Sequence, residues 1–82
     1  MTCRVHVRII PRPGLLDPPG QAVEHALGSL GFTGISSVRV GKAIEVLVEA
    51  TSPQDAEASV RRMCEKLLAN PVTEDFEIEV EG

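Results

Sequence analysis

Hydrophobic and polar residues alternate strictly near the start of the chain, in CRVHVRII (residues 3–10). Alternation with a period of two predicts a β-strand with one buried face. The residues on the predicted buried face are Cys3, Val5, Val7 and Ile9. The same period returns in ISSVRV (35–40), AIEVLVEA (43–50) and DFEIEVE (75–81). Gly41-Lys42, between the second and third segments, is a two-residue hairpin signal, so we expect these two strands to form a hairpin.

A helical period of about 3.6 residues begins at Gln21. Its apolar positions are Val23, Ala26, Leu27 and Leu30, and Gly31 is a natural stop. The stretch LLDPPGQAV (15–23) suits the start of this helix, with Asp17 as N-cap and Pro18 at the first helical position. A phosphate-binding loop is disfavoured there, because prolines remove N–H donors and the carboxylate of Asp17 repels an anion.

A second helix is predicted to begin at Ser52-Pro53-Gln54-Asp55, which resembles a capping box with proline at the first helical position. Its inner stripe is predicted to be Ala56, Val60, Met63 and Leu67, and its end lies near Asn70-Pro71.

The order strand, helix, strand, strand, helix, strand predicts a single α+β domain over residues 1–82. We expect a ferredoxin-like βαββαβ sandwich, with two helices on one face of a four-stranded antiparallel sheet. The outward residues of the first two strands are basic (Arg4, Arg8, Arg39), and those of the last two are acidic. Strand order 4-1-3-2 alternates the signs of charge across the sheet, whereas order 1-2-3-4 places Arg39 beside Arg4 and Arg8.

Composition excludes several classes of function. The formal net charge is −4, and Phe32 and Phe76 are the only aromatic residues, so the chain lacks the basic face and stacking platforms of a nucleic-acid-binding protein. No apolar run is long enough for a membrane span, and the charged N-terminus differs from a signal peptide, which predicts a cytoplasmic protein.

We find no catalytic, cofactor-binding or metal-binding residue in the sequence. Gly41-Lys42 does not belong to a nucleotide-binding P-loop, because Ser36 and Ala43 occupy the positions where that motif needs glycine and Ser or Thr. Cys3 and Cys64 are predicted to be reduced and buried rather than nucleophilic or disulfide-bonded. His6 and His25 have no metal-ligand spacing with each other or with the cysteines. By its residues alone, the chain is a binding or assembly module.

Three segments resemble the PurS family, the small subunit of multi-chain phosphoribosylformylglycinamidine synthase. They are LLDPPGQAVEHALGSLGF, SVRVGKAIEVLVE and MCEKLLANPVTEDFEIEVE. The family's segments L-D-P-x-G, V-R-x-G-K and C-E-K-L-L-A-N-x-V-x-E-D map to residues 16–20, 38–42 and 64–75. The likeness covers nearly the whole chain.

The resemblance implies a non-catalytic subunit of a glutamine-dependent ligase in purine biosynthesis. Such a subunit joins a glutaminase chain, which releases ammonia, to a large synthetase chain, and the complex uses ATP, Mg²⁺ and glutamine. The resemblance also implies a homodimer, which the thin core of a small domain favours independently. We expect Ser37 to Val40 and Phe76 to Val80 to be the edge strands available for self-association.

We expect turn residues, namely Arg39, Lys42 and Asn70, to contact the catalytic subunits, because each offers hydrogen-bond donors at an exposed turn. The alternative is that Arg39 pairs with Glu45 or Glu49, Lys42 is solvated and Asn70 caps its own helix. Two other classes of function stay open. One is an amino-acid-binding regulatory module, for which Gly14 would lie in the ligand turn, and the weaker is an acylphosphatase-like enzyme.

Overall fold

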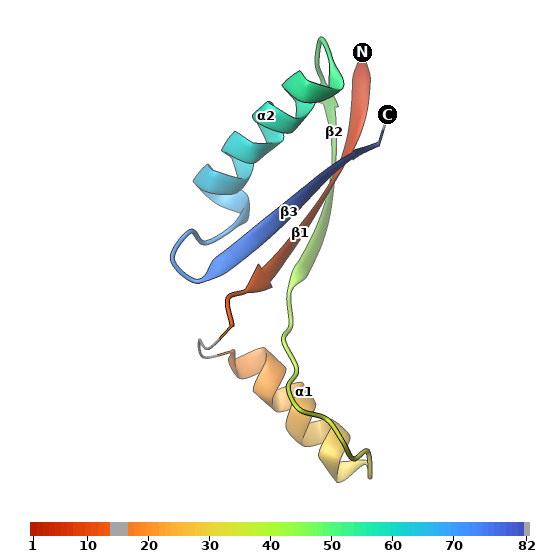
Figure 1. The fold of residues 1–82 in the computed structure, drawn as a ribbon, viewed down its shortest axis with the longest axis vertical. Helices are drawn as coiled ribbons and strands as arrows, with labels where there is room; N and C mark the ends of the chain where they lie inside the picture. Colours follow the sequence, from red (N-terminus) through yellow and green to blue (C-terminus); the bar gives the residue numbers. More distant parts are fainter. Residues whose placement is uncertain (14–16, 82) are drawn as a thin grey trace.

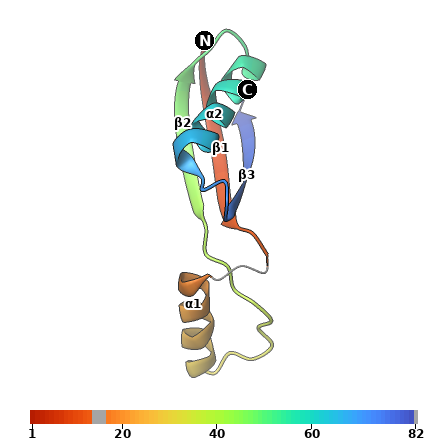
Figure 2. The ribbon, with the colours of Figure 1, turned by 90° about the vertical axis from the view of Figure 1, so that its left-hand side faces the viewer.

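The molecule is elongated, with principal extents of 50 × 24 × 15 Å. The computed structural model describes residues 1–13 and 17–81. Its elements, in chain order, are β1 (Thr2–Pro11), α1 (Pro18–Ser29), β2 (Lys42–Glu49), α2 (Pro53–Met63), the π-helix η1 (Cys64–Leu68) and β3 (Glu74–Glu81). The three strands and α2 form a layered body at one end, and α1 projects from it at the other (Figures 1 and 2).

The strands form an antiparallel sheet in the order β2-β1-β3 within the described residues. The alternation predicted for β1 is confirmed, because Val5 and Ile9 are fully buried and Cys3 and Val7 nearly so. Apolar residues of β2 and β3 pack around this central row. The sheet therefore has one face toward α2 and one face toward solvent.

The prediction of a fourth strand is wrong for this chain's own sheet. Residues 35–40 are extended but lie outside the three-stranded sheet, and the chain continues through Gly41 into β2 without a hairpin. Among the described glycines only Gly31 and Gly34 have positive φ, so Gly41 lacks the backbone conformation that a glycine-first hairpin turn needs. Gly41 has a different role. A Cβ added there would lie 2.1 Å from the carbonyl oxygen of Ile9, so the two backbones approach too closely for any other residue.

Helix α1 forms where the sequence predicts it, but not against the sheet. Asp17 is the N-cap, and its carboxylate accepts a hydrogen bond from the backbone N–H of Gly20 at 3.1 Å. Gly31 follows the helix with φ of +94°, as expected of a helix stop. Of the two α-helices in residues 1–13 and 17–81, α2 packs on the sheet and α1 does not, so the prediction of two helices on one face of the same sheet is wrong for a single chain.

Helix α2 begins at the predicted cap, where the Ser52 hydroxyl accepts from the backbone N–H of Asp55 at 3.1 Å. Its last turn widens into the π-helix η1, closed by a bond from the Ala69 N–H to the Cys64 carbonyl. The buried stripe runs through Ala56, Val60 and Cys64. The π turn directs Leu68 toward the core and leaves Leu67 82% exposed, so the inward placement predicted for Leu67, and for the exposed Met63, is wrong.

Opposite charges face one another across the solvent-facing side of the sheet. The predicted strands 4, 1 and 3 are β3, β1 and β2, and they are neighbours in the predicted order. Arg4 lies 2.8 Å from Glu45 on β2 and 3.7 Å from Glu81 on β3. Arg8 lies 3.0 Å from Glu77. These pairs are exposed, so each contributes a few tenths of a kcal/mol, enough to favour this register over a slipped one.

Candidate functional site

The predicted partner residues Arg39 and Lys42 lie at the end of the sheet where β1 ends and β2 begins. The guanidinium of Arg39 donates to the carbonyl of Pro11 at 3.0 Å. The ammonium of Lys42 donates to the carbonyl of Leu68 at 3.3 Å. Arg39 therefore does not pair with Glu45 or Glu49 of its own chain, because residues 35–40 do not join the sheet beside β2.

Asn70 lies at the same end of the molecule, in the turn between η1 and β3. Its side-chain oxygen accepts from the Val72 N–H at 3.0 Å, and its carbonyl accepts from the Glu74 N–H at 2.8 Å. The side chain thus stabilises its own turn.

Arg12, which follows the last residue of β1, lies at the same end of the sheet, and the sequence does not predict a role for it. Its guanidinium donates to the carbonyls of Pro71 at 2.7 Å and Val72 at 3.3 Å, and lies 3.0 Å from the carboxylate of Asp75. Two bonds to the turn and one to a residue of β3 join the end of β1 to the start of β3 through the Arg12 side chain. In the sequence its position between two prolines, in PRP (11–13), indicates only the end of a strand.

Together these residues form a polar end surface, which we define as Arg12, Arg39, Lys42 and Asn70. All four side chains are exposed. Arginine has five N–H donors and lysine three, so Arg39 and Lys42 keep donors beyond the one that each uses within the chain. The surface is suited to binding carbonyl or carboxylate groups of a partner and offers no group for bond-breaking chemistry.

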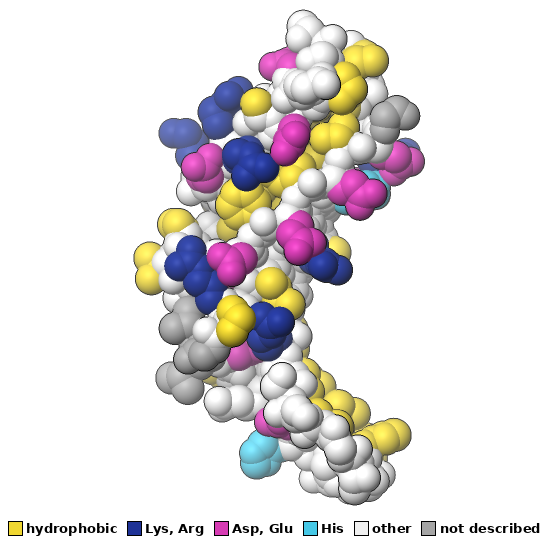
Figure 3. All heavy atoms as spheres, in the orientation of Figure 1, with side chains coloured by type: hydrophobic (Ala, Val, Ile, Leu, Met, Phe, Trp, Pro, Cys, Tyr) yellow, Lys and Arg dark blue, Asp and Glu magenta, His cyan; other side chains and the backbone are white. Residues whose placement is uncertain are grey.

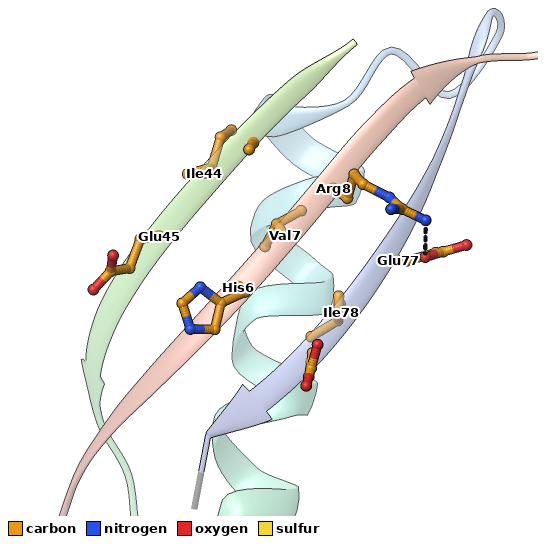
Figure 4. A pocket seen from close by; sticks show the side chains of 9 residues that line it. His6, Val7, Arg8, Ile44, Glu45, Glu77 and Ile78 are labelled. Carbon is orange, nitrogen blue, oxygen red and sulfur yellow. Dashed lines mark hydrogen bonds and ion pairs between the residues drawn. The ribbon is translucent and has the colours of Figure 1, made fainter.

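A second candidate is an open groove of about 690 Å³ on the solvent-facing side of the sheet (Figure 4). Its polar lining includes His6, Arg8, Glu45 and Glu77, and Arg8 points toward Glu77 across it. The His6 ring bonds to Glu81, which lies outside the lining, at 2.7 Å, and this hydrogen bond lowers the pKa of that carboxyl. The charges of the groove are largely matched across neighbouring strands, and solvent reaches them, so the groove lacks the desolvated acid or base that catalysis needs.

The cysteines agree with the prediction that they are reduced and buried. Cys3 and Cys64 are both free and buried. Burial raises the pKa of the Cys64 thiol, an effect that Arg61 partly opposes, so the reactive thiolate is disfavoured.

Within residues 1–13 and 17–81, no three His, Cys, Asp or Glu side chains gather into a metal site. No helix in those ranges is long and apolar enough to cross a bilayer. Gly14, the residue on which a ligand turn after the first strand depends, lies outside the described residues.

The family model for PurS, described as phosphoribosylformylglycinamidine (FGAM) synthase, matches residues 4–82. The chain belongs to the PurS family. It is 45% identical to the PurS subunit of phosphoribosylformylglycinamidine synthase from Bacillus subtilis, over 95% of this chain and 92% of that one. It is 47% identical to the PurS subunit from Mycobacterium leprae, over 92% and 91% of the two chains.

Two solved structures extend the likeness to the position of α1. PurS from B. subtilis has a TM-score of 0.86 at 44% identity, with both chains covered completely. A chain of the PurLQS structure from Thermotoga maritima has a TM-score of 0.87 at 30% identity, with 99% of each chain covered. Residues 17–41 are more than a quarter of this chain, so scores this high require these PurS chains to project their first helix in the same way.

Proposed function

We propose that this chain is the small subunit of phosphoribosylformylglycinamidine synthase in purine biosynthesis, and that it joins a glutaminase chain to an ATP-dependent synthetase chain. The observation that carries the proposal is the family match over residues 4–82, together with 45% identity to a subunit of that name. The similar chain from T. maritima comes from a structure of PurLQS, a name that joins PurS to further subunits, which supports an assembly role.

The chemistry explains why a subunit without catalytic residues matters to the reaction. Ammonia released into neutral water becomes mostly ammonium, which is not a nucleophile. A bridge that holds the two active sites in register keeps water from intercepting the ammonia and raises its effective concentration at the acceptor. In this proposal ATP, Mg²⁺ and glutamine bind to the partner chains and not to this one.

The polar end surface is the part of this chain that we assign to partner contact. Arg39 and Lys42 support the assignment, because both are exposed and keep unused donors. The case for Asn70 is weaker, since its side-chain oxygen bonds to its own turn. Contacts of this kind are typical of the polar rim of an interface.

The test is reconstitution of the three-chain complex with Arg39→Ala and Lys42→Ala. Arg62→Ala is a matched control, because Arg62 is an exposed arginine on α2 whose side chain contacts Ser59 only weakly, at 3.4 Å. We expect the first two variants to reduce glutamine-dependent synthesis and the control to leave it unchanged. Synthesis from added ammonium salts should be unaffected in all three, because it bypasses the coupling of the two sites.

Two results bear on different parts of the proposal. If the parent chain fails to co-purify with a glutaminase and a synthetase from its own cell, the subunit role itself is wrong. If the parent assembles and both variants match it in glutamine-dependent turnover, the polar end surface contacts only solvent, and the partner contact lies elsewhere on the chain.

We also propose that the chain is a homodimer in solution. The support is the thin core and the large apolar surface that the elongated chain leaves exposed. Sedimentation that shows only monomer at micromolar concentration contradicts it.

A further inference from the structure

The chain turns back beside α1 after the helix ends, and helix and loop enclose an open hollow of about 520 Å³, which we call the helix–loop groove. Its lining includes, from α1, Glu24, His25, Gly28 and Ser29, and from the loop, Phe32 and Ile35. At about 100° per residue, this side of α1 lies opposite the apolar stripe of the helix. Figure 3 shows hydrophobic side chains gathered along one side of this projecting part of the molecule. The groove therefore stays open when a neighbour covers the stripe.

The end of α1 holds Phe32 in place at the groove. The Phe32 N–H donates to the Leu27 carbonyl and the Gly31 N–H donates to the Gly28 carbonyl, both at 3.1 Å. Together with the φ of +94° at Gly31, these two bonds form a Schellman motif, which orders the backbone of the residue after the glycine. The Phe32 side chain nevertheless stays 59% exposed. The chain thus presents a large aromatic ring on a backbone that is already ordered, which lowers the entropic cost of binding a partner.

Gly28 leaves open space on the helix side of the groove. Gly31 and Gly34 have positive φ, which explains glycine at those positions, but Gly28 does not. A Cβ added at Gly28 would meet no atom within 4 Å. Alanine would therefore fit and favour the helix, because glycine is disfavoured within helices. No atom of the described residues uses this space, so Gly28 lets atoms from another chain approach the helix closely.

The charges around the groove favour a cation as its occupant. Glu24 is partly buried there, and among the described residues no ion pair includes it and no lysine or arginine lines the groove. The other phenylalanine of the chain already holds such a cation. The Arg61 guanidinium lies 5.6 Å from the centre of the Phe76 ring and 3.0 Å from the Glu57 carboxylate. Phe32 and Glu24 offer the same two groups in the groove, so a guanidinium from another chain fits there.

We propose that the helix–loop groove binds an arginine side chain of a catalytic chain of the synthase, an inference that rests on the function proposed above. The guanidinium lies over the Phe32 ring and pairs with the Glu24 carboxylate. Arginine fits better than lysine, because its planar guanidinium stacks on an aromatic ring while its N–H groups still reach a carboxylate. The His25 ring and the Ser29 hydroxyl offer acceptors for the remaining donors.

The position of the groove indicates which catalytic chain it contacts. A bridge between two chains needs two contact surfaces at separate places. The polar end surface lies where α1 joins the sheet, whereas the loop after α1 lies at the far end of the elongated molecule (Figure 1). We therefore assign the groove to the catalytic chain that the polar end surface does not contact.

The first experiment places the photoreactive residue p-benzoylphenylalanine at position 32 and uses the reconstituted three-chain complex. Irradiation followed by mass spectrometry identifies the segment that lies against the groove. We expect a covalent product with one catalytic chain, in a segment that contains an arginine. The proposal is overturned if there is no product, if the product joins only a second copy of this chain, or if the captured segment contains no arginine.

The second experiment measures binding of each catalytic chain to Phe32→Ala and Glu24→Gln. Each variant should raise the dissociation constant of one catalytic chain by roughly fivefold or more and leave that of the other within about twofold of the parent. The matched controls are Leu47→Ala, since Leu47 is 62% exposed on β2, and Glu65→Gln, since Glu65 is exposed on η1. Both controls should bind as the parent does. Equal weakening by the controls overturns the proposal.

Gly28→Leu guards against variants that bind poorly because they fold poorly. Leucine is a strong helix former, so the urea midpoint should not fall, while its side chain occupies the groove. We expect weaker binding of the same catalytic chain that Phe32→Ala affects. Binding equal to that of the parent contradicts an occupied groove.

Failure of this proposal and failure of the proposed function give different results. If the parent binds neither catalytic chain, the subunit role is wrong and the groove proposal is wrong with it. If the parent binds both, and Phe32→Ala, Glu24→Gln and Gly28→Leu bind as the parent does, only the groove proposal is wrong.

Discussion

Asp17 joins helix α1 to the extended segment 35–40, so replacing it tests whether residues 17–41, which we call the arm, act as one unit. Its carboxylate accepts from the N–H groups of Gly20 and Val40, at 3.1 and 3.0 Å. Loss of an N-cap side chain costs about 1 kcal/mol. Loss of a further hydrogen bond to a backbone N–H costs about 1 kcal/mol more. We therefore expect Asp17→Ala to lower the free energy of unfolding by about 2 kcal/mol per chain.

Two comparison variants sharpen the measurement. Asp17→Asn keeps one acceptor oxygen, which can serve only one of the two N–H groups, so the expected loss is about 1 kcal/mol. Ser52→Ala removes the cap of α2 and also costs about 1 kcal/mol, but this helix lies on the sheet and not on the arm. Urea unfolding followed by circular dichroism, at several chain concentrations, gives the three values.

The dimer dissociation constant shows whether the Asp17 hydrogen bonds act only as a helix cap or also hold the arm in the conformation that the dimer needs. If these two hydrogen bonds form only in the proposed homodimer, 2 kcal/mol corresponds to a roughly 30-fold weaker association per chain in Asp17→Ala. Ser52→Ala should leave the dissociation constant close to that of the parent. Equal weakening by Asp17→Ala and Ser52→Ala, or an unchanged urea midpoint for Asp17→Ala, refutes the reasoning.

Three further predictions concern the core, the sheet and the connection at Gly41. Cys64→Ala should leave glutamine-dependent activity of the reconstituted complex intact while lowering the free energy of unfolding by about 1–2 kcal/mol, because its thiol is packed and not reactive. The hydrogen bond from His6 lowers the pKa of Glu81. The stabilisation that this bond gives the folded chain is therefore present above the ordinary carboxyl pKa and is lost as the pH falls through the lowered value. An NMR titration should show the Glu81 pKa rising toward its ordinary value in His6→Ala. Insertion of Asn-Gly after Gly41 provides a turn that the chain lacks, so size-exclusion chromatography should show a shift from dimer to monomer as the arm folds back on its own sheet. An inserted variant that stays fully dimeric contradicts the argument that the missing turn at Gly41 keeps the arm off its own sheet.

The strands and their order along the sheet were predictable because the signals are local and agree with one another. Alternation identified the buried face of β1, and opposite charges at positions such as Arg8 and Glu77 fixed which strands are neighbours. The caps at Asp17 and Ser52 were predictable for the same reason, since a cap depends on residues within one turn.

The position of the arm was not predictable in this way. The sequence of residues 35–40 fits an edge strand equally well whether the neighbouring strand belongs to the same chain or to a second copy, because the backbone groups and side-chain parity are identical. The hairpin signal at Gly41 rests on residue type alone. The Ile9 carbonyl lies so close to Gly41 that no side chain fits there, and this long-range contact cannot be read from one sequence.

The polar end surface was predicted only in part. Arg39 and Lys42 were chosen for exposure near a turn, and both are exposed, although the turn itself does not form. Asn70 bonds within its own turn. Arg12 was missed because its three partners, at positions 71, 72 and 75, are far from it in sequence and two of them are backbone carbonyls, which leave no trace in residue identity.

The π turn at η1 has a consequence for how relatives are aligned. A π turn holds one residue more than an α turn, so α2 and η1 together have the length of a regular helix that has gained a single insertion. A relative with a regular α-helix here needs a one-residue gap within positions 64–68. Where the turn is kept, position 67 tolerates polar residues because it faces water, and selection for an apolar residue falls on position 68.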